Sequence, residues 1–400
     1  MTYPQGRLVG SLAAVQMVGG VGNGAGLAIG ALLVKDVSGS SGWAGTATVM
    51  LTIGAAVTTV PLARWAVRSG RRPALTTGWL IGALGALVSI VGADLDSLPI
   101  VLLGLVLFGA STASNLQSRF AATDRAEPRK VARSLSVVVW ATTIGAVAGP
   151  NLTTPGARVA GVLGVPDLAG PLVFSTVAFA VAGLLTFVLV RPDPLAPEAG
   201  AARRPRVSPW PHLRGRALTA VVAIAASHAV MVSVMSLTPV HMQDHGADLE
   251  IIGLTISLHI AGMFALSPVF GWLSDVLGPA VMVVAGQVVL VVSTVVSGTA
   301  GHSEPQIMAG LVLLGVGWSM SVIASAAMLT TAVSAEARPA VQGVADLAMN
   351  VAGATGGLLA GLVMAWRDFG TLNAAAAVLT LPVIGLVVAG SRAAADVARD

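Results

Sequence analysis

Twelve long apolar stretches divide this chain, and they limit what it can fold into more than any other feature. Each holds about 20 mostly hydrophobic residues, the length that an α-helix needs to cross a bilayer. Only 10% of the residues are charged and the mean hydropathy is +0.85, whereas a soluble domain carries about a quarter charged residues. We therefore expect an all-α membrane protein with transmembrane helices at 8–34, 43–66, 73–93, 98–120, 133–154, 172–190, 217–240, 251–274, 279–300, 306–332, 340–366 and 369–391.

The chain also repeats itself. The phrase Gly-Leu-Val-Leu-Phe-Gly at 104–109 returns as Gly-Leu-Val-Leu-Leu-Gly at 310–315, and a Gly-x-x-x-Gly pair at 145–149 returns at 353–357. Tandem halves of apolar helices are typical of secondary transporters, whose binding site lies near the membrane midplane between the halves. The repeat predicts two pseudo-symmetric bundles of six helices each.

A basic segment separates the two copies. Residues 191–216 contain six Arg and six Pro with little periodicity, which is typical of a linker. We therefore expect an N-terminal bundle at 1–190, a cytoplasmic linker at 191–216 and a C-terminal bundle at 217–400. With both termini in the cytoplasm, 19 of the 22 Lys and Arg residues face that side, as the positive-inside rule requires.

Several function classes are excluded by absent motifs. The chain has no cysteine, so thiolate chemistry is impossible. It contains no His-Glu-x-x-His, no Gly-x-Ser-x-Gly and no Gly-x-x-x-x-Gly-Lys-Ser/Thr, so we expect neither an enzyme nor an ATP-driven pump. The basic residues are scattered over short loops, which does not indicate nucleic-acid binding.

The segment at 63–72, here called the signature loop, reads Ala-Arg-Trp-Ala-Val-Arg-Ser-Gly-Arg-Arg. It resembles the loop Gly-x-Leu-Ala-Asp-Arg-x-Gly-Arg-Arg/Lys of the major facilitator superfamily. The second copy, at 271–280, keeps an acidic residue at 275, whereas Val67 stands at the family's Asp position. The resemblance implies the superfamily fold, alternating access and a gating role for Arg68, Gly70, Arg71, Arg72 and Asp275.

Gly145, Gly149 and Pro150 lie in the fifth predicted helix. Small residues let helices approach closely and Pro imposes a bend, so we predict a helix-packing motif. The three residues also resemble part of a motif of drug–proton antiporters in the same superfamily. That resemblance keeps open an alternative function, a proton-coupled exporter of amphipathic organic compounds.

Three ionisable residues stand well inside predicted helices: His228, His259 and Asp346. Such residues are costly in hydrocarbon and usually functional. Asn350 lies one turn after Asp346 on the same helix face, so we predict that the pair couples transport to protons. The polar residues Gln16, Asn23, Asn115 and Gln117 are instead predicted to form hydrogen bonds between helices.

Methionine and histidine recur on the seventh and eighth helices. Met231 and Met235 share a face with His228, and His259 precedes Met263 by one turn. Thioether and imidazole together suit copper, Cu(I) above all, although Met also serves as core filler.

The paired Met-x-x-x-Met and His-x-x-x-Met motifs resemble those of CcoA-like (CalT) bacterial copper importers. The resemblance implies copper uptake across the bacterial cytoplasmic (inner) membrane, with Met231, Met235, His259, Met263 and His228 as the site. We expect no prosthetic group, a monomer, and only a small substrate and lipid as partners.

Overall fold

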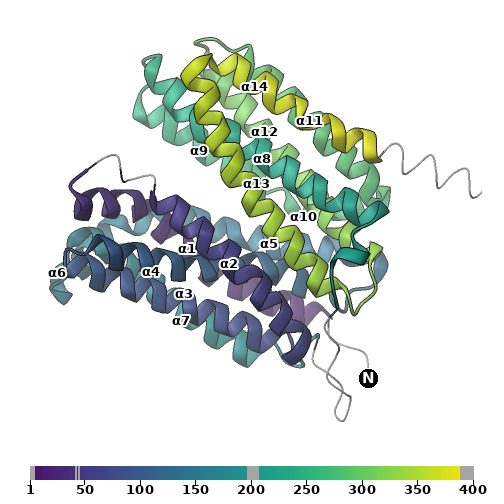
Figure 1. The fold of residues 1–400 in the computed structure, drawn as a ribbon, viewed down its shortest axis with the longest axis horizontal. Coiled ribbons are helices and arrows are strands. Elements are labelled where there is room, and N and C mark those ends of the chain that lie inside the picture. Colours follow the sequence, from purple (N-terminus) through teal and green to yellow (C-terminus); the bar gives the residue numbers. More distant parts are fainter. Residues whose placement is uncertain (1–4, 41–42, 44–45, 196–206, 388–400) are drawn as a thin grey trace, which may run out of the picture. The chain divides into compact units, whose positions relative to one another are not determined.

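The computed structural model describes residues 5–40, 43, 46–195 and 207–387. Helices form all the regular elements of these residues, and no strand occurs among them. The chain divides into two compact units, one of residues 1–126 and 141–207 and the other of residues 127–140 and 208–400. Figure 1 shows each unit as a bundle of long helices.

Seven α-helices precede the predicted linker. They are α1 (Gln5–Ser38), α2 (Thr46–Ser69), α3 (Arg71–Asp94), α4 (Leu98–Ala121), α5 (Val131–Ala148), α6 (Thr153–Leu163) and α7 (Gly170–Leu189). Short 3-10 turns, η2 (Pro128–Lys130), η3 (Pro150–Leu152) and η4 (Asp167–Ala169), flank α5 and α6. The short α6 was not predicted as an element of its own.

Besides a helical stretch at 381–387, seven more labelled α-helices follow the linker. They are α8 (Gly215–Asp244), α9 (Leu249–Phe264), α10 (Ser267–Leu277), α11 (Pro279–Gly298), α12 (Glu304–Ala332), α13 (Arg338–Trp366) and α14 (Phe369–Val378), with the 3-10 turn η5 (Trp210–His212) before α8. Residues 196–206 of the predicted linker and 388–391 of the last predicted helix lie outside the described residues. The predicted bundle boundaries remain a prediction, and residues 127–140 group with the second unit.

The transmembrane prediction is confirmed. Eleven stretches of the described residues are long and apolar enough to cross a membrane, and each coincides with a predicted segment. The twelfth, predicted at 133–154, is α5. Its 18 residues span about 27 Å at 1.5 Å per residue, close to the thickness of the hydrocarbon layer, and η3 continues it.

One predicted span is broken. The segment predicted at 251–274 is divided into α9 and α10, with Ala265 and Leu266 in the turn between them. Pro268 lies in the first turn of α10, where the missing N–H of Pro costs no helix hydrogen bond, whereas further inside a helix it would. The break therefore places Pro268 where it is tolerated, whereas Pro61 and Pro239 lie inside the unbroken helices α2 and α8.

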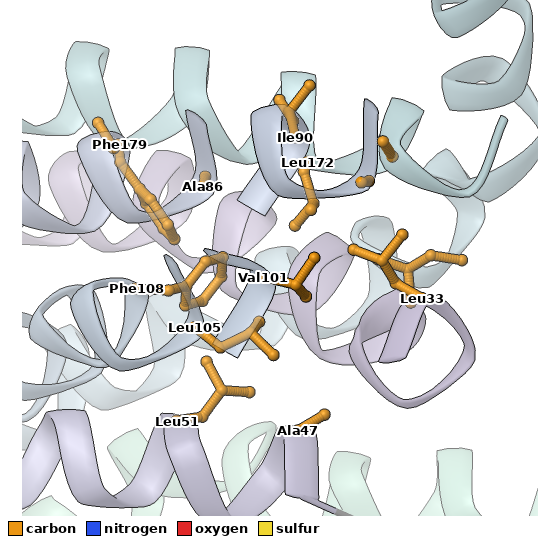
Figure 2. Packing of buried hydrophobic residues seen from close by; sticks show 14 of the residues in the cluster. Leu33, Ala47, Leu51, Ala86, Ile90, Val101, Leu105, Phe108, Leu172 and Phe179 are labelled. Carbon is orange, nitrogen blue, oxygen red and sulfur yellow. The ribbon is translucent and has the colours of Figure 1, made fainter. Parts of the chain in front are cut away.

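Aromatic rings fill the core of the first unit. Phe179 lies 4.9 Å from Phe108, edge to face, and 5.7 Å from Trp79 between ring centroids. Figure 2 shows Phe179 reaching toward Phe108 within the cluster. A Cβ atom at α1 positions Gly19, Gly22 or Gly26 would collide with one of these rings, so the glycines of α1 make the space that the rings occupy.

The repeated phrase has a packing explanation. Gly104 of α4 touches Ser89 of α3, and Gly310 of α12 touches Ser297 of α11 in the same way. The second glycine of each phrase also has equivalent neighbours. Gly109 touches residues 51–55 of α2, and Gly315 touches residues 259–263 of α9. Both units thus use one glycine pair to bring three helices into close contact, which explains why the phrase occurs twice.

The outward face of the helices is apolar. On α3, Leu80, Leu84, Leu87 and Val91 follow one helical stripe, and each is between 45% and 51% exposed. A contiguous apolar stripe of this kind is unfavourable in water but suits lipid. The chain is therefore a multi-pass membrane protein.

Candidate functional site

The predicted copper ligands lie in the second unit. Met231 of α8 and Met263 of α9 are 4% and 8% exposed and belong to one apolar cluster, against which the partly buried Met235 packs. Leu311 and Trp318 of α12 belong to the same cluster. The structure therefore places the three predicted thioethers in or against the apolar core of this unit.

His259 is fully buried beside this cluster. Its Nδ1 lies 2.8 Å from the carbonyl oxygen of Leu311, and because a carbonyl only accepts, Nδ1 must carry the proton. Nε2 of the neutral ring then presents a lone pair, and it has no hydrogen-bond partner. An orphaned buried acceptor costs about 1–3 kcal/mol, so a ligand at Nε2 would relieve an existing penalty.

His228 has the opposite tautomer. The indole Nε1–H of Trp318 donates to His228 Nδ1 at 3.2 Å, so in the neutral ring Nε2 carries the proton. This ring occupies space left by Gly353, since a Cβ there would lie 2.9 Å from His228 Nε2. Of the two predicted imidazole ligands, only His259 has its Nε2 lone pair available.

Tight backbone packing fixes His259 relative to α12. A Cβ atom on Gly315 would lie 2.9 Å from the backbone nitrogen of Met263, and one on Gly262 would lie 2.8 Å from the carbonyl oxygen of Val312. Both glycines are needed for this close approach. The approach sets the register in which Leu311 meets the imidazole.

Asp346, the predicted proton-coupling residue, is completely buried on α13. The Asn350 side chain donates to the backbone carbonyl of Asp346 at 2.8 Å, which confirms that both residues lie on one face. Asn350 thus bonds the main chain of Asp346. The proton-coupling role of the pair remains a prediction.

The signature loop contains a buried ion pair. The guanidinium of Arg71 donates to both carboxylate oxygens of Asp124, at 2.8 and 3.2 Å, and both side chains are at most 2% exposed. Arg72 lies over the ring of Phe187 at 5.0 Å, and Arg68 is exposed. Residues of one sequence motif therefore have three different environments.

Asp275 of the second copy lies at the start of α5. Its carboxylate oxygens accept hydrogen bonds from the backbone N–H groups of Ala132 and Arg133, both at 3.0 Å. These donors belong to the first turn of α5, where N–H groups lack partners inside the helix and a negative charge is favourable. Asp275 therefore acts as a remote cap within the second unit.

Gly145 and Gly149 pack against α1. A Cβ atom on either would overlap the backbone of Gly20 or Gly24, so two glycine pairs meet face to face, followed by Pro150 at the start of η3. Such close approach is what Gly-x-x-x-Gly provides between membrane helices. The geometry supports the packing role.

The polar residues of the first unit bond between helices as predicted. Gln16 donates to Asn115, Asn23 accepts from Ser111 at 2.8 Å, and Gln117 donates to the Thr59 carbonyl at 2.9 Å.

A buried hydrogen-bond network in the second unit was not predicted from the sequence. Gln287 of α11 donates to Ser227 and to Ser321, both at 2.7 Å. The signal for it was a lone glutamine inside an apolar helix.

Metal ligands of the usual kind are absent from this arrangement. Within the ranges that the structure describes, no group of three or more His, Asp or Glu side chains is placed to hold a metal ion. A copper site in this unit would therefore depend on the thioethers together with His259.

Comparison with known proteins places the chain in a family. A model of the Major Facilitator Superfamily matches residues 11–250 and 221–396. The uncharacterized MFS-type transporter YddS of Bacillus subtilis is 37% identical, over 93% of this chain and 88% of that protein. The riboflavin transporter RfnT of Brucella anthropi is 28% identical, over 90% of this chain and 89% of that protein.

Solved structures share the fold. A bacterial homologue of the iron transporter ferroportin superposes with a TM-score of 0.80 at 14% identity, covering 96% of this chain and 99% of that one. The fucose:proton symporter FucP of E. coli superposes with a TM-score of 0.76 at 14% identity, covering 98% and 99%. With the family match over nearly the whole chain, the protein belongs to the major facilitator superfamily and is a secondary transporter.

Proposed function

We propose that this transporter takes up copper through a Met/His site in its second unit, by alternating access of the two units across the bacterial inner membrane. The observation that carries the proposal is the buried imidazole of His259. Its tautomer is set by Leu311, its Nε2 lone pair has no partner, and it lies beside a cluster containing Met231 and Met263.

The chemistry of these groups favours a soft cation. Thioether sulfur and imidazole nitrogen are neutral ligands that suit Cu(I), and hard cations prefer oxygen. A hydrogen bond from the far ring nitrogen to a carbonyl is the usual way in which a metal-binding histidine is oriented. Because the ligands are neutral and few, the ion would be held during reorientation and still released.

Proton coupling is the proposed source of energy. Asp346 is a fully buried carboxyl group in a helix that is apolar over most of its length. Such a carboxyl can change its protonation state as its surroundings change between conformations. With Asn350 as its neighbour, it is the proposed proton site.

A second candidate cargo is an organic heterocycle. A relative that matches about nine-tenths of this chain is a riboflavin transporter, and riboflavin contains a planar heterocyclic ring system. The same class of cargo includes the amphipathic compounds that a proton-coupled exporter would expel. This reading predicts that the methionines near His259 serve only to fill the core.

Transport assays with a matched pair of variants separate the two candidates. Met231→Leu removes the sulfur at nearly constant volume, a change that usually costs under about 1.5 kcal/mol. Met282→Leu does the same at a buried methionine of α11 outside the cluster. Proteoliposomes of each variant are given radioactive copper with a reductant and, separately, labelled riboflavin.

The copper site is supported if copper uptake falls at least about tenfold in Met231→Leu and is unchanged in Met282→Leu. Changes in the ligand shell of a metal commonly have effects of this size. Copper uptake that is absent from the unmodified protein, or equal in both variants, contradicts the copper site. Riboflavin uptake by all three proteins would then favour the second candidate.

A further inference from the structure

The beginning of the linker packs back onto the first unit. Leu195 is 5% exposed and contacts Ala66 of α2 and Ala74 of α3 in a small apolar cluster. The carbonyl oxygen of Pro194 accepts a hydrogen bond from Arg125 Nε at 2.9 Å. Residues 191–195, here called the clasp, are therefore fixed to the signature loop on one side and to the end of α4 on the other.

The centre of the clasp is Asp193. Its carboxylate accepts hydrogen bonds from the backbone N–H groups of Arg71 at 3.0 Å and Arg72 at 2.8 Å, and from Leu195 N–H at 2.8 Å. The first two donors open helix α3, where N–H groups lack intrahelical partners and a negative charge is stabilising. Asp193 thus caps a helix that begins 122 residues earlier in the chain.

The signature loop is shaped to receive this carboxylate. Gly70 has φ +99°, a conformation that favours glycine, and a Cβ atom there would collide with the Asp193 carboxylate. Gly70 has no side chain, so it cannot cap α3 itself. The family's acidic position in the loop is occupied by Val67, which is 7% exposed and has no charge.

Arg71 joins the clasp to the buried ion pair. Its backbone N–H bonds Asp193, and its side chain bonds Asp124 through two hydrogen bonds. Release of Asp193 would free the first turn of α3 and so loosen the backbone from which the Arg71 side chain reaches Asp124.

We propose that Asp193 is a positioning residue for the transport cycle. Asp193 supplies, from the linker, a carboxylate that the first signature loop lacks. Through Asp193 the linker docks and the loop becomes ordered together. With the gating role that the family resemblance implies for this loop, the clasp then sets the ratio of the conformations of the transporter. The clasp would act in the same way whichever cargo is carried.

The test measures that ratio directly. The chain has no cysteine, so spin labels attached at Ser69→Cys and Val276→Cys, both exposed positions, report one distance distribution in the full-length protein. Asp193→Asn removes the charge at constant shape, and Asp193→Glu restores it. Asp36→Asn, at an exposed residue at the far end of α1, is the matched control.

We expect Asp193→Asn to change the ratio of the two distance populations by about tenfold or more, the factor that the loss of one charge-assisted hydrogen bond represents. Asp193→Glu should restore part of the change, and amide exchange at residues 71 and 72 should accelerate in Asp193→Asn alone. If Asp193→Asn lowers only the melting temperature, with a distribution equal to that of Asp36→Asn, the clasp is a structural cap and the proposal is wrong.

A second variant covers the case in which Asp193→Asn fails to fold. Arg125→Gln removes the charged donor to Pro194 and leaves Asp193 in place. A shift of the distance populations in this variant supports the proposal. A distribution equal to that of the control overturns it.

Discussion

Replacing Gly315 by Ala should destabilise the second unit through one methyl group. The new Cβ would lie 2.9 Å from the Met263 nitrogen and closer still to the His259 carbonyl oxygen, so α9 and α12 must move apart. Overpacking of this kind costs about 1–3 kcal/mol. If the movement also breaks the 2.8 Å hydrogen bond between His259 and Leu311, about 0.5–1.5 kcal/mol more is lost.

Gly361→Ala is the matched control for this change. Gly361 is an exposed residue inside α13, and a Cβ atom there would meet no heavy atom within 4 Å. An alanine in a helix interior is more favourable than glycine by roughly 0.5–1 kcal/mol, so this variant should be slightly more stable. The two variants make the same chemical change and should have opposite effects.

Thermal unfolding of the purified protein in detergent measures both. At about 2–4 °C per kcal/mol for a domain of this size, Gly315→Ala should melt roughly 3–18 °C lower, and Gly361→Ala at or slightly above the unmodified protein. If Gly315→Ala melts at the same temperature as Gly361→Ala, helices α9 and α12 are not held by glycine contact, and the proposed register of His259 is wrong.

Three further outcomes follow from single contacts. Asp275→Asn presents an amide N–H₂ to one of the two α5 donors that the carboxylate now caps, so amide exchange at residues 132 and 133 should become several-fold faster; unchanged exchange contradicts the capping role. Asp346→Asn should abolish transport driven by a pH gradient while counterflow persists, and proton-driven transport at the normal rate would make Asp346 a packing residue. Hydrogen bonds from Thr371 lower the pKa of Asp368. The ionised Asp368 side chain should therefore stabilise the start of α14 at pH values above the ordinary Asp pKa, and this stabilisation should be lost as the pH falls through the lowered pKa. Asp368→Ala should speed amide exchange in α14 at pH 7 but not in strong acid.

The sequence was sufficient to predict most of the long helices of the fold. Segments predicted at 98–120 and 279–300 are α4 (Leu98–Ala121) and α11 (Pro279–Gly298), since apolar length alone decides what crosses a bilayer. Hydropathy averaged over 20 residues could not detect the 11-residue α6 or the break before α10, because both depend on short-range features.

The contacts of the candidate site were harder to predict. Spacing along one helix predicts which residues share a face, so it grouped Met231 with Met235 and His259 with Met263, and the role of these groups stays a prediction. It could not assign the ring nitrogens of His228 and His259, because the tautomers depend on Trp318 and Leu311 of another helix.

Long-range pairs involving charged residues were missed for a similar reason. Asp193 is one of two acidic residues in the linker 191–216, and nothing in its neighbourhood indicates a partner 122 residues away. Arg71 was assigned a gating role from its motif, and nothing in that motif predicted that its side chain is 1% exposed and paired with Asp124.

The central claim is that thioethers and His259 hold the transported ion, and X-ray absorption of the Cu(I)-loaded protein tests it most directly. We predict sulfur and nitrogen neighbours around copper in the unmodified protein and in Met282→Leu, with fewer sulfur neighbours in Met231→Leu and weaker binding in competition with a Cu(I) chelator. A copper spectrum without sulfur neighbours, or one that Met231→Leu leaves unchanged, would contradict the proposed site.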